Sequence, residues 1–264
     1  MEEVTGSSPV SPTLSLPHTD RMVDEAAAAV SWTGPGLLLI RHRRSTYNDD
    51  GLWTGRHDPP LSARGREEAE QVRRGLADCD VDRAVVSDLR RTRETADVIL
   101  GDRVPLVPVT TEVLLGELDS PAWAGLTRGE IERWWPGALA GWREGTLRDL
   151  PQAESWEAFR ARVLLGLARA ADLGARVLVV AHAGVLLAAG EALGSEHGKV
   201  ARSRGLWLTR TARGGLRAGP LQRLQPTSGR DQPSAEEDEQ RQAHQGRDGD
   251  DTTAHQVTLP HPRS

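Results

Sequence analysis

Two runs of four aliphatic residues each lead to a histidine, and they constrain the fold more than any other feature of the sequence. Residues 37–40 precede Arg41 and His42, and residues 177–180 precede Ala181 and His182. All-apolar runs of this length are typical of parallel strands that are covered on both faces. Right-handed crossovers would bring the carboxyl ends of two such strands to the same edge of one sheet. The sequence therefore predicts that the two histidines lie near each other.

Segments with helical periodicity separate the predicted strands. Ser62 is typical of an N-cap, and the segment behind it places Ala69, Val72 and Leu76 on one face. Further helices are expected at residues 88–100, 155–172 and 185–193. Further strands are expected at residues 81–87, 104–109, 206–209 and 216–221. This alternation predicts a three-layer α/β/α sandwich with a mostly parallel central sheet.

Two connecting segments carry little regular periodicity. Residues 48–60 are rich in glycine and proline and are expected to form a loop. Residues 110–151 contain several tryptophans and one expected short helix near residues 128–135. We expect this second segment to cover one end of the sheet, with its tryptophans packed in the interior.

The ends of the chain differ in composition from its middle. Residues 1–35 form an expected disordered leader and residues 226–264 an expected disordered acidic tail, which leaves a domain at residues 36–225. The net charge of -5 argues against a nucleic-acid partner, and the single cysteine, Cys79, allows a reducing compartment. No apolar run approaches the length of a membrane span. These features predict a cytoplasmic protein with no membrane partner.

Five short motifs occur in an order that resembles a known family. Arg41-His42 is similar to an Arg-His-Gly motif, and four further blocks follow at residues 54–62, 87–96, 115–118 and 179–184. Together they resemble the histidine phosphatase superfamily, also called phosphoglycerate mutase-like, over roughly residues 36–225. Five blocks in the same order are a more specific signal than any one of them.

The resemblance implies a role for each of five charged or titratable residues. His42 would be the nucleophile that forms a phosphohistidine. Arg41 and Arg91 would bind the phosphoryl oxygens, because a guanidinium group matches their geometry. His182 would stabilise the charge of the transferring group, and Glu117 would be the general acid and then the general base.

The resemblance also implies a substrate-binding wall of small residues, and it implies neither a metal nor another cofactor. This wall would contain Ser45, Asn48, Thr54 and Gly55. Two of the assignments have rivals near them in the chain. Arg90 and Arg93 compete with Arg91, and Glu112 and Asp119 compete with Glu117.

The chain departs from the family pattern directly after the nucleophile. Arg43 and Arg44 stand where glycine and often glutamate are usual, and Ala183 follows His182 in place of glycine. An inward Arg43 would add a donor to the site, and an outward one would change nothing. A third alternative is that Arg43 blocks the site and leaves a phosphate-binding protein without activity.

The expected activity is that of a histidine acid-type phosphatase, a metal-independent phosphomonoesterase that hydrolyses a small phosphorylated metabolite. The chain would act as a monomer or homodimer. A cofactor-primed mutase is the first alternative, although family mutases tend to carry a longer insertion between Glu117 and His182. A shorter insertion leaves water access to the phosphoenzyme and favours hydrolysis. The second alternative is the non-catalytic binding protein.

Overall fold

The computed structural model describes residues 32, 34–104, 106–195 and 200–225. Most of the predicted leader and all of the predicted tail therefore lie outside the described residues, and both stay predictions. Among the described residues, no helix combines the length and the apolar character needed to cross a bilayer.

The described residues form one six-stranded sheet with the strand order β3-β2-β4-β1-β5-β6. Its strands are β1 (Gly36–Arg41), β2 (Arg83–Val86), β3 (Val109–Thr111), β4 (Arg176–Ala181), β5 (Arg204–Arg210) and β6 (Leu216–Arg223). The first four strands run parallel to one another, whereas β5 and β6 pair antiparallel. The mostly parallel sheet is confirmed, with β1 and β4 as adjacent central strands.

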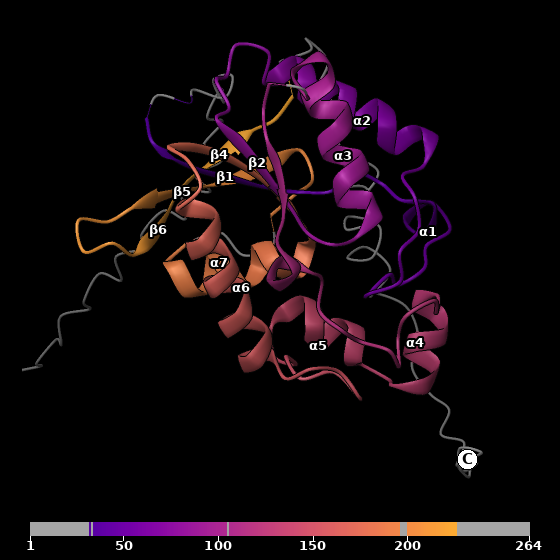
Figure 1. Ribbon diagram of the computed structural model, residues 1–264. Helices are drawn as coiled ribbons and strands as arrows, with labels where there is room; N and C mark the ends of the chain where they lie inside the picture. The colour runs from indigo at the N-terminus through magenta and orange to yellow at the C-terminus, as the bar shows by residue number, and fades with distance from the viewer. Residues whose placement is uncertain (1–31, 33, 105, 196–199, 226–264) are drawn as a thin grey trace, which may run out of the picture.

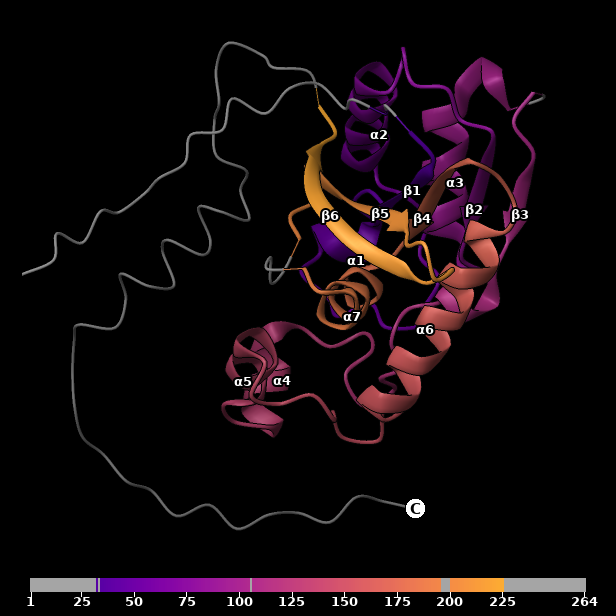
Figure 2. The same cartoon turned by 90° about the vertical axis from the view of Figure 1, so that its left-hand side faces the viewer.

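Helices cover both faces of this sheet (Figures 1 and 2). α2 (Ala63–Gly75) and α3 (Arg90–Leu100) pack on one face, and α6 (Trp156–Ala171) and α7 (Ala183–Leu193) pack on the other. Along β1, Leu38 and Ile40 belong to the first core, while Leu37 and Leu39 belong to the second. Because successive side chains of a strand point to opposite faces, burial of both faces requires the all-apolar runs in the sequence.

A lobe of two short helices lies beyond one end of the sheet (Figure 2). It contains α4 (Arg128–Trp134) and α5 (Ala138–Glu144), and tryptophans fill the space between this lobe and α6. Trp53 packs edge-on against Trp123 with ring centroids 4.9 Å apart, and Trp142 packs likewise against Trp156 at 5.6 Å. We call residues 113–155 the cap. Trp123 is buried in it as expected, whereas Trp134 is exposed.

The structure corrects three expectations about secondary structure. The segment expected to be a loop begins inside α1 (Thr46–Asp49), and α5 was not foreseen. Strand β3 begins at Val109, where the strand expected at residues 104–109 was to end. The 3₁₀ helix η1 (Gly101–Arg103) continues into a turn, and Pro108, which has no amide N–H to give to a sheet, precedes the strand. A second 3₁₀ helix, η2 (Val113–Leu115), opens the cap.

Helix α2 is held tightly against the turn that follows β1. Ser62 caps the helix as predicted, because its Oγ accepts a hydrogen bond from the Gly65 amide. The backbone carbonyl of Arg44 approaches this turn so closely that a Cβ at Gly65 would lie 1.9 Å from the carbonyl oxygen. Gly65 thus permits the contact that fixes the segment carrying the first histidine.

Candidate active site

The two histidines lie side by side at the carboxyl ends of β1 and β4. Arg41 pairs with Ala181 in the register of these strands, so His42 and His182 occupy equivalent next positions. The amide of His42 still donates to the Ala181 carbonyl at 2.9 Å, and the two ring centroids are 5.3 Å apart. Both side chains are buried. The predicted proximity of the histidines is confirmed.

Hydrogen bonds define which nitrogen of His42 is available for reaction. Nδ1 lies 2.7 Å from the carbonyl oxygen of Arg43, and since a carbonyl only accepts, Nδ1 carries the ring proton. Arg91 Nε donates to Nε2 at 3.2 Å, which requires a lone pair on Nε2. Burial, and then the charge of Arg91, lower the pKa of His42 well below 6.5. The ring is therefore neutral, with a nucleophilic Nε2.

Arg91 is positioned by carbonyl oxygens of the loop that was predicted between residues 48 and 60. Its Nη2 donates to Gly55 O at 2.9 Å, and its Nη1 donates to His57 O at 2.6 Å. The side chain is fully buried, and burial lowers the pKa of Arg91 to about 10. The rivals Arg90 and Arg93 are exposed. The structure therefore places Arg91, and neither rival, beside His42.

His182 has one partnered and one unpartnered ring nitrogen. Its Nε2 lies 2.7 Å from Ser87 Oγ, whereas its buried Nδ1 has no hydrogen-bond partner among the described residues. If Ser87 donates to Nε2, Nδ1 carries the ring proton and is a donor that no acceptor among the described residues uses. Burial is the main cause that lowers the pKa of His182 well below 6.5. Ser87 belongs to the motif at residues 87–96, but its contact with His182 was not predicted from the sequence.

Glu117 is held at the cavity wall by two backbone amides. Its Oε1 accepts from Leu118 N at 2.9 Å, and its Oε2 accepts from Gly184 N at 3.4 Å. A Cβ at Gly184 would lie 2.4 Å from Oε1, so a larger residue there would displace the carboxylate. Of the rivals, Glu112 accepts from Leu114 N at the start of η2, and Asp119 is exposed.

Among the four small residues expected at the substrate wall, the structure separates Ser45 from the others. Ser45 and Asn48 form a reciprocal capping box at the start of α1, in which Ser45 Oγ accepts from Asn48 N and Asn48 Oδ1 accepts from Ser45 N. Ser45 is buried beneath this turn, while Asn48, Thr54 and Gly55 line the cavity. Ser45 thus supports the cavity wall from beneath and does not line the cavity.

Arg43 is buried behind the site. Its Nη2 donates to Arg41 O at 2.6 Å, its Nη1 donates to Arg202 O, and its amide donates to Thr95 Oγ1 at 3.0 Å. The side chain therefore points away from the cavity and ties the end of β1 to the segment before β5. This arrangement agrees with the alternative in which Arg43 points out of the site, with the difference that the side chain is buried, and the cavity stays open.

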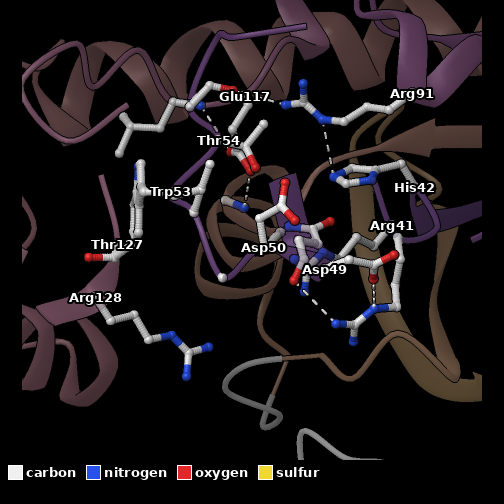
Figure 3. A pocket seen from close by; sticks show the side chains of 18 of the residues that line it. Arg41, His42, Asp49, Asp50, Trp53, Thr54, Arg91, Glu117, Thr127 and Arg128 are labelled. Carbon is white, nitrogen blue, oxygen red and sulfur yellow. Dashed lines mark hydrogen bonds and ion pairs between the residues drawn. The ribbon is translucent and has the colours of Figure 1, made fainter. Parts of the chain in front are cut away.

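The cavity has a volume of about 520 Å³ and is lined from both the sheet end and the cap. In Figure 3, His42 and Arg91 lie on one side of it, and Thr127 and Arg128 lie on the other. Arg41 also lines it, as the sequence predicted. Lining residues that were not predicted from the sequence include Asp49, Asp50, Trp53, Thr127, Arg128, Leu139, Trp142, Arg143 and Arg202. Most of these come from α1 and the cap, where no periodic pattern indicated which side chains would face inward.

A neutral imidazole beside a buried guanidinium, with a second histidine and a carboxylate at the same sheet edge, is typical of phosphoryl transfer through histidine. The model of the histidine phosphatase superfamily (branch 1) matches residues 37–205. The chain therefore belongs to this superfamily, and the suspected resemblance is confirmed.

Its relatives include both phosphatases and mutases. The adenosylcobalamin/alpha-ribazole phosphatase of Escherichia coli K12 is 31% identical over 156 residues, which cover 57% of this chain and 74% of the relative. A 2,3-bisphosphoglycerate-dependent phosphoglycerate mutase of Methylobacterium radiotolerans is 34% identical over 160 residues, covering 58% and 76%. The mycobacterial glucosyl-3-phosphoglycerate phosphatase structure superposes with a TM-score of 0.62 at 28% identity, covering 71% of this chain and 97% of that one.

We expect the two buried neutral histidines to make the protein less stable in mild acid. Their folded pKa values lie below 6.5, so the unfolded chain binds more protons as the pH falls below 6.5. The free energy of unfolding should then fall by up to about 1.4 kcal/mol per pH unit for each histidine. Urea unfolding between pH 7 and 5 measures this slope, which should decrease in His182→Asn.

His57→Gln is the matched control, because His57 is exposed. Its slope should equal that of the wild type. Carboxylates such as Glu94, whose pKa is lowered from 4.5, contribute in a separate window at lower pH. An unfolding free energy that is constant from pH 7 to 5 would contradict the assignment of neutral buried histidines.

Proposed function

We propose that this chain is a metal-independent phosphomonoesterase that acts through a phosphohistidine on His42. The observation that carries the proposal is the hydrogen bond from Arg91 Nε to His42 Nε2, together with the bond that keeps the proton on Nδ1. A guanidinium group beside a nucleophilic nitrogen suits a phosphoryl group, because the guanidinium can bind a phosphoryl oxygen while the lone pair of the nitrogen attacks phosphorus.

The proposed reaction has two steps. Nε2 of His42 attacks phosphorus, the bond from phosphorus to the leaving oxygen breaks, and Glu117 gives that oxygen a proton. Glu117 then removes a proton from water, whose oxygen attacks phosphorus and breaks the P–N bond, so that inorganic phosphate leaves. Arg41, Arg91 and the unpartnered Nδ1 of His182 would stabilise the negative charge on the phosphoryl oxygens in both steps.

The proposed substrate is a small phosphorylated metabolite that is larger than phosphate itself. A cavity of about 520 Å³ lies within the range of small-molecule sites. Arg128 and Arg143 of the cap, together with Trp142, line the part contributed by the cap and favour a polar or anionic group on the leaving alcohol. We place the reaction in the cytoplasm, without a nucleic-acid or membrane partner.

A mutase is the second candidate, because several relatives carry that name. A mutase must keep the phosphoenzyme from water until the product is rephosphorylated. The cap of this chain contributes only two short helices, and Asp50 and Gly51 at the cavity wall are exposed. This access favours hydrolysis. The buried orientation of Arg43 also weakens the case for a blocked, non-catalytic binder.

We expect phosphate release from p-nitrophenyl phosphate and from a panel of metabolite phosphates to be unchanged by excess EDTA and to be inhibited by vanadate. The reason is that guanidinium groups, in place of a metal ion, provide the positive charge beside His42. Malachite-green detection of phosphate measures turnover with and without the chelator. Loss of activity in EDTA would contradict metal independence, and activity that requires a bisphosphorylated primer would indicate the mutase.

A further inference from the structure

One arginine of α6 binds the backbone of the segment that carries Glu117. Nη1 of Arg162 donates to Leu114 O at 2.8 Å and to Gly116 O at 2.7 Å. Its Nη2 donates to Glu117 O at 3.0 Å. A single planar guanidinium thus satisfies three carbonyl oxygens within four residues. Gly116 and Glu117 lie beyond the end of η2, outside helices and strands, where a backbone has few other ways to be held rigidly.

Glu154 completes this arrangement from the opposite side. Its two carboxylate oxygens accept from Nε and Nη2 of Arg162, and its Oε1 also accepts from the Asp119 amide at 2.9 Å. The Glu154 amide donates back to Asp119 O at 3.1 Å. The pair therefore holds the backbone immediately before and after Glu117, and the ring of Phe159 packs 4.7 Å from the guanidinium carbon.

These contacts determine where the Glu117 carboxylate lies relative to His42. The carboxylate itself is held by only two amide donors, one of them at 3.4 Å. Neither Arg162 nor Glu154 is a cavity-lining residue, so neither would touch the substrate. Proton transfer requires hydrogen-bond reach between the acid and the leaving oxygen, and small displacements lose that reach.

We propose that Arg162, with Glu154, is a positioning residue that holds Glu117 at proton-transfer distance from the leaving oxygen. This inference rests on the proposed function. It predicts a specific defect in kcat/KM, which covers the steps up to release of the alcohol, because in those steps Glu117 acts only as an acid and matters most when the leaving group needs a proton. Attack of water on the phosphoenzyme, in which Glu117 is the base, is common to both substrates and enters kcat alone. Alkyl phosphates release a strongly basic alkoxide, whereas p-nitrophenyl phosphate releases a stabilised phenolate.

The test compares β-glycerophosphate with p-nitrophenyl phosphate in Arg162→Lys. Lysine keeps the charge beside Glu154 and loses the planar fork. We expect kcat/KM for β-glycerophosphate to fall by about 10- to 50-fold, and kcat/KM for p-nitrophenyl phosphate to change by less than about threefold. Glu117→Gln should show the same selectivity with a larger loss, of about 10²- to 10⁴-fold.

The double variant distinguishes an effect that acts through Glu117 from a general loss of structure. If Arg162 acts through Glu117, adding Arg162→Lys to Glu117→Gln should cost almost nothing further on β-glycerophosphate. Arg160→Lys, at an exposed position of the same helix, is the control and should match the wild type on both substrates. If Arg162→Lys does not fold, Glu154→Gln replaces it and should show the same selective loss.

Two outcomes would overturn the inference in distinguishable ways. Equal losses of kcat/KM on both substrates, or additive losses in the double variant, would reject the positioning role while leaving the phosphatase intact. A wild type that releases phosphate from neither substrate would reject the proposed function, and with it the role of Arg162.

Discussion

Replacement of His42 by alanine is expected to reduce turnover by about 10⁴-fold or more, the scale at which covalent nucleophiles contribute. The substitution removes Nε2, the atom that Arg91 contacts at 3.2 Å, and leaves water as the only attacking group. Because the ring is buried and its pKa is lowered, the wild-type nucleophile is already neutral at pH 7.

The measurement has two parts. Steady-state phosphate release gives the loss of turnover, and rapid quenching with ³²P-labelled substrate tests for an acid-labile phosphoenzyme. His182→Ala is the informative comparison, since it keeps the Nε2 of His42 and should still form labelled enzyme, although more slowly. Labelled protein in His42→Ala, or turnover above a tenth of the wild-type rate, would show that another residue is the nucleophile.

The sequence was sufficient to predict the sheet and its two histidines. Apolar runs of this kind commonly form parallel strands that are covered on both faces. Ser62 and Ser155 lie at the starts of two helices and cap them. These signals are local, and the expectation that both strand ends lie at the same edge of the sheet follows from them and from the handedness of crossovers. The parts of the site at the strand ends were therefore accessible before the structure.

The cap and the supporting contacts were not accessible in the same way. Whether Arg128 or Arg143 lines the cavity depends on how two short helices pack on the sheet end, and neither helix has a long apolar stripe. Arg162 contacts carbonyl oxygens 45 to 48 residues away, and backbone carbonyls are invisible to a pattern of side chains. Each such contact is set by tertiary packing.

Arg43 is a second case in which tertiary packing decides what the sequence pattern alone could not predict. A large cation in place of glycine beside the nucleophile suggested an extra donor, an outward side chain without effect, or a blocked site. The structure instead buries it against two carbonyl oxygens, those of Arg41 and Arg202. The carbonyl of Arg43 still accepts from His42 Nδ1, so this contact to the nucleophile depends on the backbone of residue 43 and not on its side chain.

Replacement of Arg91 by lysine is expected to lower kcat/KM by about 10²- to 10³-fold, the loss typical of removing one donor from a preorganised anion site. Lysine keeps a positive charge and cannot make the three simultaneous bonds to His42 Nε2, Gly55 O and His57 O. The lysine ammonium group would be more mobile than the guanidinium group. The loop that contains these two carbonyl groups would lose the hydrogen bonds that hold it in place.

Arg90→Lys is the matched control, because Arg90 is exposed and its guanidinium pairs with Glu94 at 2.6 Å. It should stay within about twofold of the wild type, as surface substitutions usually do. Vanadate inhibition separates binding from chemistry, and Arg91→Lys should weaken it along with kcat/KM because the same donor serves both. Equal activity of the two variants would contradict the assignment of Arg91 as a phosphoryl ligand. Arg41 would then be the remaining candidate of the two arginines predicted to bind the phosphoryl oxygens.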